Sequence, residues 1–307
     1  MHNVPNESIL SGNNEIVIRV FAEQFGGGFW GEEDEIKIYN QNFSLSMFSD
    51  WFVAKGVDLN KISVKPKNPT DVDVPTVLFN AMIFPLTRLN IKGILWYQGE
   101  SNVDEPDKYG RYFKELITDW RRRFNREDIA FLFVQLANYN DENDESKENW
   151  ARLREAQESL LALSNTGMIC SIDVGEANDI HPRNKQDIGN RLALLAKKII
   201  YKKNVIYTGP KYDNHQIKDD NIIVNWTLTG DSLKTNDGLQ PREFAIASDD
   251  KIFYRANVLI DKCKTILNST EVKQPVAVRY AWNNNPNCNL TDESGLPALP
   301  FRTDSWN

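Results

Sequence analysis

Apolar runs alternate with amphipathic stretches through the middle of the chain. Three short runs are almost wholly apolar: IKGILWYQ (91–98), IAFLFVQLA (129–137) and GMICSIDV (167–174). Around them, apolar residues recur at helical spacing over residues 105–124, 147–163 and 184–202. Strand–helix alternation of this kind predicts a parallel sheet covered by helices on both faces. A short buried helix is predicted just before it, at PTVLFNAMIFPL (75–86).

Both ends of the chain have a period of two instead. NEIVIRVFA (14–22) and EIKIYN (35–40) flank a glycine cluster and predict a β-hairpin from an all-β module. From about residue 205, the runs NIIVNWTL, EFAIAS, KIFYRANVLI and PVAVRYAW predict a second all-β module. The predicted organisation is a β module, a polar linker, an α/β domain and a C-terminal β-sandwich, at residues 1–54, 55–76, 77–204 and 205–307.

The predicted parallel sheet has few strands. Three are evident, whereas about five or six are usual in a sheet of this class. An unpaired edge would invite aggregation. We therefore expect that further strands come from elsewhere, or that the domain begins before this chain does.

Charge and composition narrow the function classes. The formal net charge is −7 and the pI is about 5.2, which argues against a nucleic-acid or anionic-membrane partner. The one basic run, Arg121–Arg123, falls in an amphipathic pattern and is interpreted as a solvated helix face. No apolar stretch is long enough to cross a membrane. Three cysteines provide neither a disulfide framework nor metal-ligand spacing.

A glycine motif near the N-terminus does not indicate a nucleotide site. FGGGFWG (25–31) matches the G-x-G-x-x-G spacing, but that site needs a helix directly after the glycines. The segment that follows, EEDEIKIY, is acidic and strand-like and would repel a phosphate. A glycine-rich hairpin loop is the preferred interpretation.

The first apolar run ends in WYQGESN (96–102), where polar residues gather. Ligands of open α/β sheets bind outside the carboxyl ends of the strands, so Gln98, Glu100 and Asn102 are predicted at such an edge. A side-chain amide there is a natural oxyanion donor. The alternative for Asn102 is a helix cap, because Glu105 follows it at capping-box spacing. Ser101 lies outside a G-x-S-x-G elbow and is not expected to be a nucleophile.

The second and third runs end in polar residues as well. VQLANY (134–139) places Gln135 and Asn138 at the end of its strand, where both are predicted to line the same cleft.

The third run leads into NDIHPRNK (178–185), which holds one of only three histidines. A lone histidine is usually structural, but His181 follows a strand end, and Asp179 and Glu176 are near enough to orient its ring. The other histidines, His2 and His215, fall in unrelated segments, so a metal site is not predicted.

Several long motifs resemble those of one enzyme family. WYQGESN, WARLREAQ (150–157), NTGM (165–168) and GEANDIHPRNKQDIGNRLALLA (175–196) resemble sialate O-acetylesterases of the SGNH hydrolase superfamily. The tail VRYAWNNNPNCNLTDESGLPALPFRTDSW (278–306) is similar to the C-terminal end of the family, and VIRVFAEQFGGGFWG resembles part of its inserted β-sandwich module.

The resemblance implies an SGNH-hydrolase-like (flavodoxin-like) α/β fold with flanking all-β segments. It implies a carbohydrate esterase that hydrolyses O-acetyl esters of sialic acid or related glycans, with no metal or organic cofactor. His181 would be the general base, Asp179 its orienting acid, and Asn102 or Gln98 an oxyanion donor. Glu100, Gln135, Asn138 and Glu176 would contact substrate. Family members are typically exported.

Two departures from the family pattern change this expectation. The superfamily often spaces acid and histidine as D-x-x-H, whereas here Asn178 occupies that acid position, so Glu176 is the alternate to Asp179. The family's nucleophile lies in an early G-Q-S-N block, which these 307 residues do not contain. The chain is therefore interpreted as the C-terminal portion of such an enzyme, incomplete on its N-terminal side. The alternatives are a non-catalytic glycan-binding remnant and an inactive fragment.

Overall fold

The computed structural model describes residues 11–13, 15–18, 37–47, 74–228 and 230–306. Contacts between Cα atoms divide the chain into two units, Met1–Asn68 and Pro69–Asn307, which we describe separately.

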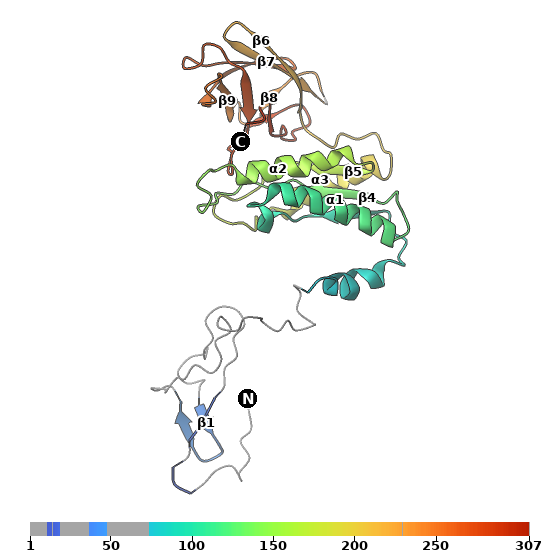
Figure 1. Cartoon of the computed structure of the whole chain (residues 1–307), viewed down its shortest axis with the longest axis vertical. Coiled ribbons are helices and arrows are strands. Elements are labelled where there is room, and N and C mark those ends of the chain that lie inside the picture. The colour runs from blue at the N-terminus through green and yellow to red at the C-terminus, as the bar shows by residue number, and fades with distance from the viewer. Residues whose placement is uncertain (1–10, 14, 19–36, 48–73, 229, 307) are drawn as a thin grey trace. The chain divides into compact units, whose positions relative to one another are not determined.

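The described part of the first unit contains one hairpin. Strand β1 (Lys37–Tyr39) pairs antiparallel with β2 (Ser44–Ser46) (Figure 1). The strand predicted at EIKIYN is therefore confirmed. Residues 15–18 form no strand, so the prediction for 14–22 is wrong there, because an alternating pattern forms a strand only where a partner can accept its backbone hydrogen bonds. Residue 14, residues 19–22 and the glycine cluster lie outside the described residues.

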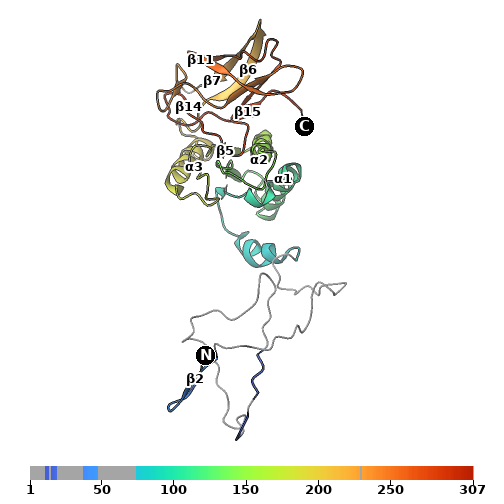
Figure 2. The same cartoon turned by 90° about the vertical axis from the view of Figure 1, so that its left-hand side faces the viewer.

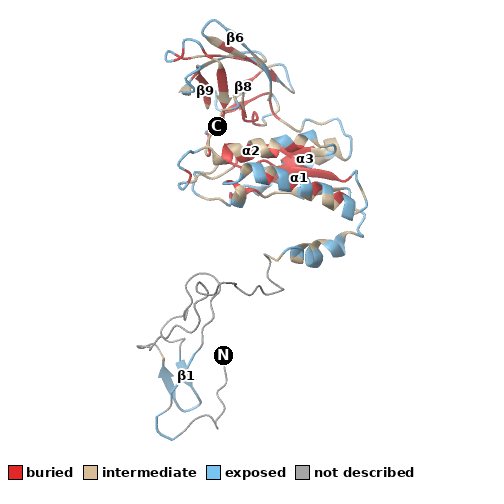
Figure 3. Ribbon diagram, in the orientation of Figure 1, coloured by how far each residue is buried: buried red, intermediate tan, exposed pale blue. Residues whose placement is uncertain are grey.

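The second unit opens with a short helical segment. It consists of a π-helical turn, Phe79–Ile83, and a 3-10 turn, Phe84–Leu86. The predicted helix is thus present, but the prediction that it is buried is wrong. Met82 is 63% exposed and Phe84 57% exposed. In Figure 3 this segment is drawn in the colours of exposed and intermediate residues. An apolar composition alone does not say whether another element covers it. Of the predicted linker, residues 55–73 lie outside the described residues.

A parallel sheet forms the centre of this unit. Its order is β3-β4-β5, and both pairs of neighbours are parallel. The strands and helices alternate along the chain as predicted: β3 (Gly93–Trp96), α1 (Pro106–Arg123), β4 (Ala130–Val134), α2 (Asn149–Ser159), β5 (Thr166–Ile169) and α3 (Lys185–Ile199).

Strand β4 is buried on both faces because helices cover each side of the sheet. Phe131 and Phe133 belong to the larger core cluster with residues of α1 and α2, whereas Leu132 and Val134 pack with residues of α3. Figure 2 shows α3 on one side of β5, with α1 and α2 on the other. A strand enclosed in this way needs apolar residues at every position, which explains its continuous apolar run.

Helix α1 corrects the interpretation of the basic run. Arg122 and Arg123 are exposed, but Arg121 is only 9% exposed. Its guanidinium donates to the backbone carbonyls of Ile129 (3.0 Å) and Ser164 (2.7 Å). Position 121 continues the apolar stripe of the helix at a spacing of four, so its side chain reaches the interior rather than solvent.

The C-terminal residues form two four-stranded antiparallel sheets. The first has the order β10-β9-β13-β15 and the second β11-β12-β7-β6. Their strands are β6 (Lys211–Lys218), β7 (Asn221–Thr227), β9 (Phe244–Ala247), β10 (Tyr254–Arg255), β11 (Asn257–Asp261), β12 (Lys264–Asn268), β13 (Ala277–Tyr280) and β15 (Phe301–Arg302). A further pair joins β8 (Lys234–Thr235) to β14 (Leu290–Thr291).

Aromatic side chains hold the two sheets together. Trp226 of β7 meets Phe301 edge-on at a centroid distance of 5.4 Å and Tyr280 at 5.7 Å. These two partners come from the opposite sheet, so the arrangement is a β-sandwich with its core between the sheets. The boundary at residue 205 stays a prediction, because one continuous core cluster includes residues from both sides of it.

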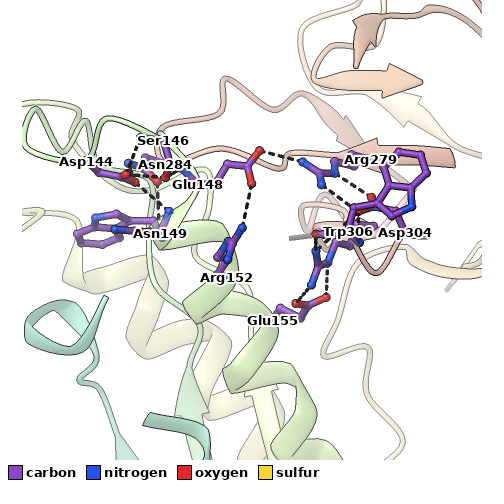
Figure 4. Close-up of polar contacts among 12 residues, drawn as sticks. Asp144, Ser146, Glu148, Asn149, Arg152, Glu155, Arg279, Asn284, Asp304 and Trp306 are labelled. Carbon is purple, nitrogen blue, oxygen red and sulfur yellow. Dashed lines mark hydrogen bonds and ion pairs between the residues drawn. The ribbon is translucent and has the colours of Figure 1, made fainter. Parts of the chain in front are cut away.

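Charged pairs join α2 to the β-sandwich (Figure 4). Arg279 forms two hydrogen bonds with Asp304, of 2.8 and 2.9 Å, and a third with Glu148 at 2.8 Å. Arg302 forms a bidentate pair with Glu155. The sandwich therefore has a fixed contact with the α/β part through α2.

Asp144 accepts a hydrogen bond from the backbone N–H of Asn149, the first residue of α2, at 2.9 Å. Burial acts to raise the pKa of this carboxyl group, but hydrogen bonds from Ser146, Asn149 and Asn284 outweigh burial and lower the pKa to about 2. The ionised carboxylate thus ties the loop before α2 to the tail segment that contains Asn284.

Candidate active site

The carboxyl ends of the three parallel strands meet at one edge of the sheet. After β3, Gln98 and Asn102 interact directly, because the Gln98 side-chain amide donates to the Asn102 amide oxygen at 2.7 Å. The NH₂ group of Asn102 makes no hydrogen bond within the described parts of the chain. It is therefore the amide of the pair that is available to donate to a ligand.

The capping interpretation of Asn102 is wrong. Helix α1 begins at Pro106, its N-cap is Glu105, and no side chain caps it. Asn102 instead lies in a 3-10 turn, Glu100–Asn102, and its side chain accepts from Gln98.

Gly99 brings this turn close to the core. A Cβ atom at Gly99 would lie 3.0 Å from a methyl group of Leu153 and 3.3 Å from the side-chain amide of Gln157. A larger residue would push the turn outward, so glycine sets the position of Gln98 and Asn102. The Gln98 carbonyl is held by the Tyr109 hydroxyl at 3.0 Å.

Gln135 and Asn138 do not line the same cleft, contrary to the prediction. Gln135 is fully buried beneath α2, where its amide donates to the Arg154 carbonyl at 3.2 Å. Side chains alternate along a strand, so Gln135 follows Phe133 onto the α2 face. The hollow at the strand ends is lined instead by Asn138 together with Asp173 and Asn285, and Gln135 does not line it.

Asn138 anchors the loop that carries His181. Its side-chain oxygen accepts from the Gly175 backbone N–H at 2.9 Å, and its NH₂ group donates to Asn285 at 2.8 Å. Two residues further on, the Asn140 N–H donates to the Ala177 carbonyl at 2.9 Å. The segment that follows β4 therefore binds the loop that follows β5 through these hydrogen bonds.

His181 lies exposed in this loop. Its backbone N–H donates to Asp179 Oδ1 at 2.9 Å, and the backbone N–H of Arg183 donates to Glu176 Oε1 at 2.8 Å. Both candidate acids thus stabilise the loop backbone, and Asp179 is bonded to the backbone of His181 itself. Asp179 Oδ2 makes no hydrogen bond within the described residues.

The loop that carries His181 ends just before α3. Helix α3 begins at Lys185, and its N-cap Asn184 accepts from the Asp187 N–H at 3.2 Å. Pro182 therefore lies in the loop rather than in the first turn. At the other end of the loop, Asp173 forms a bidentate pair with Arg191, at 2.6 and 2.7 Å, which fixes the loop to α3.

Two buried polar residues of α2 support the edge and were not predicted. Gln157 is fully buried; its oxygen accepts from the Leu136 N–H at 2.9 Å and its amide donates to the Val134 carbonyl at 3.2 Å. Arg154 is 1% exposed and donates to four backbone carbonyls. Two of them follow β4 (Leu136 and Ala137), and two lie in the tail segment (Asn283 and Asn284). The signal in the sequence is that positions 150, 153, 154 and 157 share one helix face in WARLREAQ.

Replacing Gly175 with alanine should disturb this edge. A Cβ atom there would lie 2.2 Å from the Asn138 carbonyl oxygen and 2.4 Å from its side-chain oxygen, so the loop must move. We expect a loss of about 2 kcal/mol or more in the free energy of unfolding, measured by urea titration. The control is Gly189→Ala in α3, where nothing lies within 4 Å and alanine should be neutral or stabilise by up to about 1 kcal/mol. Equal stabilities of the two variants would show that the close approach at Gly175 carries no cost.

The described residues provide no group of three or more His, Cys, Asp or Glu that could hold a metal ion. Cys170 is not suited to nucleophilic attack, because burial raises the pKa of its thiol to about 12. The described helices include none that is both long and apolar enough to span a membrane.

Comparisons with known proteins agree on one family. Residues 76–198 match the family model described as a carbohydrate esterase, sialic acid-specific acetylesterase. The sialate O-acetylesterase of Mus musculus is 32% identical over 266 residues, covering 78% of this chain and 48% of that protein. The Homo sapiens protein of the same name is 30% identical over 253 residues, covering 74% and 48%.

A solved structure extends the similarity to the fold. A novel carbohydrate acetylesterase from Xanthomonas citri superposes with a TM-score of 0.72 at 40% sequence identity, covering 76% of this chain and 55% of that one. The predicted SGNH-hydrolase-like α/β fold with flanking all-β segments is confirmed. The chain spans about half the length of the curated relatives it matches. With the family model, the relatives and the fold in agreement, the chain belongs to the sialate O-acetylesterase family of carbohydrate esterases.

Proposed function

We propose that this chain carries the base and oxyanion-binding side of a carbohydrate O-acetylesterase site. The observation that supports this most directly is that the loop of His181 and the turn of Gln98 and Asn102 both follow strands of one parallel sheet at its carboxyl edge. This edge is where open α/β sheets bind their ligands. The relatives' names supply the substrate class, an O-acetylated sialic acid or related glycan.

In the proposed reaction, His181 takes the proton of a serine hydroxyl as that oxygen attacks the acetyl carbonyl. The tetrahedral oxyanion accepts a hydrogen bond from the NH₂ group of Asn102, which Gln98 holds in place. The imidazolium then returns the proton to the sugar oxygen as the ester C–O bond breaks. Water, deprotonated by His181, hydrolyses the acetyl-serine and releases acetate.

We propose Asp179 as the acid that orients His181, with Glu176 as the alternate. Asp179 already contacts the backbone of His181 through Oδ1, and its second oxygen is available for the imidazole. Glu176 contacts Arg183, two residues beyond the histidine. We assign Glu100 and Asn138 to substrate contacts at the edge, and Gln135, because of its burial, to support of α2.

The nucleophile is proposed to lie outside these 307 residues, on an upstream segment or a partner chain, because no Gly-Gln-Ser-Asn block occurs in the sequence. Labelling of the purified chain with a fluorophosphonate probe, measured by intact mass, tests this. We expect no stoichiometric adduct on folded chain, while a serine hydrolase in the same tube is labelled. A single adduct would overturn this assignment, and peptide mapping would identify the serine.

A non-catalytic glycan-binding role is the second candidate, and the absent serine block favours it. The two functions differ in product. When a preparation contains a serine-bearing segment, the esterase releases acetate from O-acetylated sialic acid. A binding protein takes up the same sugar and leaves the ester intact.

A further inference from the structure

A second cavity adjoins the candidate active site without sharing its proposed catalytic residues. It has a volume of about 760 Å³, is partly open to solvent, and is lined by residues of the β-sandwich and by Glu148, the N-cap residue of α2. Pockets of about 300–1,000 Å³ are typical of small-molecule sites. None of Gln98, Asn102, Asp179 and His181 lines it.

The charge of its lining is positive. Four cationic side chains line the cavity (Arg242, Lys251, Arg255 and Arg279), against two carboxylates (Glu148 and Glu243). Only two of the four cations form ion pairs with described residues.

Two of the arginines are neutralised within the protein. Arg279 is held between Asp304 and Glu148, and Arg242 pairs with Asp237 at 2.7 Å. By contrast, neither Lys251 nor Arg255 forms an ion pair with any described residue, and both are exposed. The cavity therefore presents two cationic groups that lack an anion.

Aromatic rings line the same space. Phe253 and Trp306 lie with their centroids 5.7 Å apart, and Lys251 Nζ is 5.7 Å from the Trp306 ring. Trp306 is fixed by its backbone, whose carbonyl accepts from Arg302 at 2.9 Å and whose N–H donates to Asp304 at 3.2 Å (Figure 4). A rigid aromatic surface beside cationic groups suits a ring that is apolar on one face and carries an anion.

Trp282 adds an unsatisfied donor to the lining. Its indole N–H is buried and has no acceptor among the described residues. Two guanidinium groups lie near this ring, those of Arg302 at 4.7 Å and Arg279 at 5.6 Å. Trp282 is thus held in place, and Trp306 is the other tryptophan of the lining on which a ligand can stack.

We propose that this cavity is a second binding site, for a saccharide that carries a carboxylate. Lys251 and Arg255 bind the carboxylate, and the sugar ring packs on Trp306. Asn287 lines both this cavity and the hollow that contains Asn138 and Asp173, so the two are neighbours on the surface. A bound glycan would be held beside the edge where the ester is cleaved, but binding here does not require hydrolysis.

Isothermal titration calorimetry of the whole chain with 3′-sialyllactose and with lactose tests the proposal. Neither sugar carries an acetyl ester, so a failed esterase assignment leaves this result intact. We expect sialyllactose to bind about tenfold more tightly than lactose, as one charge-assisted contact would give. The double variant Lys251→Ala/Arg255→Ala should remove this preference, and Trp306→Ala should weaken binding of both sugars.

The matched control is Lys264→Ala/Lys273→Ala, which removes two exposed charges of the same β-sandwich that do not line the cavity. It should leave the preference unchanged. Equal binding of the two sugars, or a preference that survives in Lys251→Ala/Arg255→Ala, would overturn the proposal. So would loss of sialyllactose binding in His181→Ala alone, which would place the ligand at the candidate active site. Competition by citrate as strong as that by sialyllactose would also overturn the proposal, because the site would then recognise the carboxylate without the sugar ring.

Discussion

Replacing His181 with alanine should lower kcat/KM for acetate release by about 10²- to 10⁴-fold, the contribution of a general base. The assay uses O-acetylated sialic acid and a preparation that contains the nucleophilic serine, whether within this chain or on an added segment. The exposed position of His181 and the backbone nature of its described bond predict that the variant folds normally. Its urea midpoint should stay close to that of the parent chain.

His215 provides the matched control. It lies in β6, where its Nδ1 is 2.8 Å from the Tyr212 hydroxyl, and burial lowers its pKa. His215→Ala removes the same group from a position outside the parallel sheet, so activity should remain near the parent value. Full activity in His181→Ala would refute the assignment of the base, whereas equal losses in both variants would point to a general effect on folding.

The largest loss of stability is expected for Arg154→Ala. Burial lowers the pKa of this guanidinium to about 10, yet it stays charged at neutral pH, and its described partners are four backbone carbonyls. Alanine would leave these buried backbone carbonyls without their donors and would create a cavity where the guanidinium lay. The free energy of unfolding should fall by about 3–5 kcal/mol in a urea titration followed by circular dichroism.

Arg152→Ala is the control on the same helix. Its contact with Glu148 is 3.9 Å long and its side chain is 37% exposed, so its loss should cost about 0.5 kcal/mol or less. Arg154→Met keeps the volume of the side chain but none of its donors, and should be nearly as unstable as Arg154→Ala. A stability of Arg154→Met close to that of the parent would show that packing, rather than hydrogen bonding, is the contribution of Arg154.

The sequence predicted those parts of the fold whose pattern is repeated over many residues. The three parallel strands, their helices and the C-terminal strands β7, β9, β10, β11 and β13 followed from periodicity, because each element buries one face or both. Strands β6, β12 and β15 were not predicted. The edge positions of Gln98, Asn102 and His181 followed from where the strands end. Periodicity does not specify which residues a given side chain contacts in the folded protein.

Single side chains illustrate that difference. Arg121 and Arg154 carry charges that favour solvent, yet each lies on an apolar stripe and binds carbonyls distant in the sequence. Gln135 follows the last residue of β4, and the alternation of side chains along the strand directs it toward α2, where it donates to the Arg154 carbonyl. The apolar segment 75–86 has the composition of a core helix, but none of its residues is buried in the structure. In each case the outcome depends on tertiary partners that a local pattern does not specify.

The bonds between the edge and the tail also determine when the edge can assemble during synthesis. Asn138 binds a residue 147 positions later in the chain, and Arg154 binds one 130 positions later. Contacts so far apart form slowly, since a long loop must close first. While a ribosome is still synthesising the β-sandwich, the sheet and its helices can collapse from local contacts, but the loop of His181 lacks part of its anchorage until residues 283–285 emerge. The histidine therefore reaches its final position among the last steps of folding.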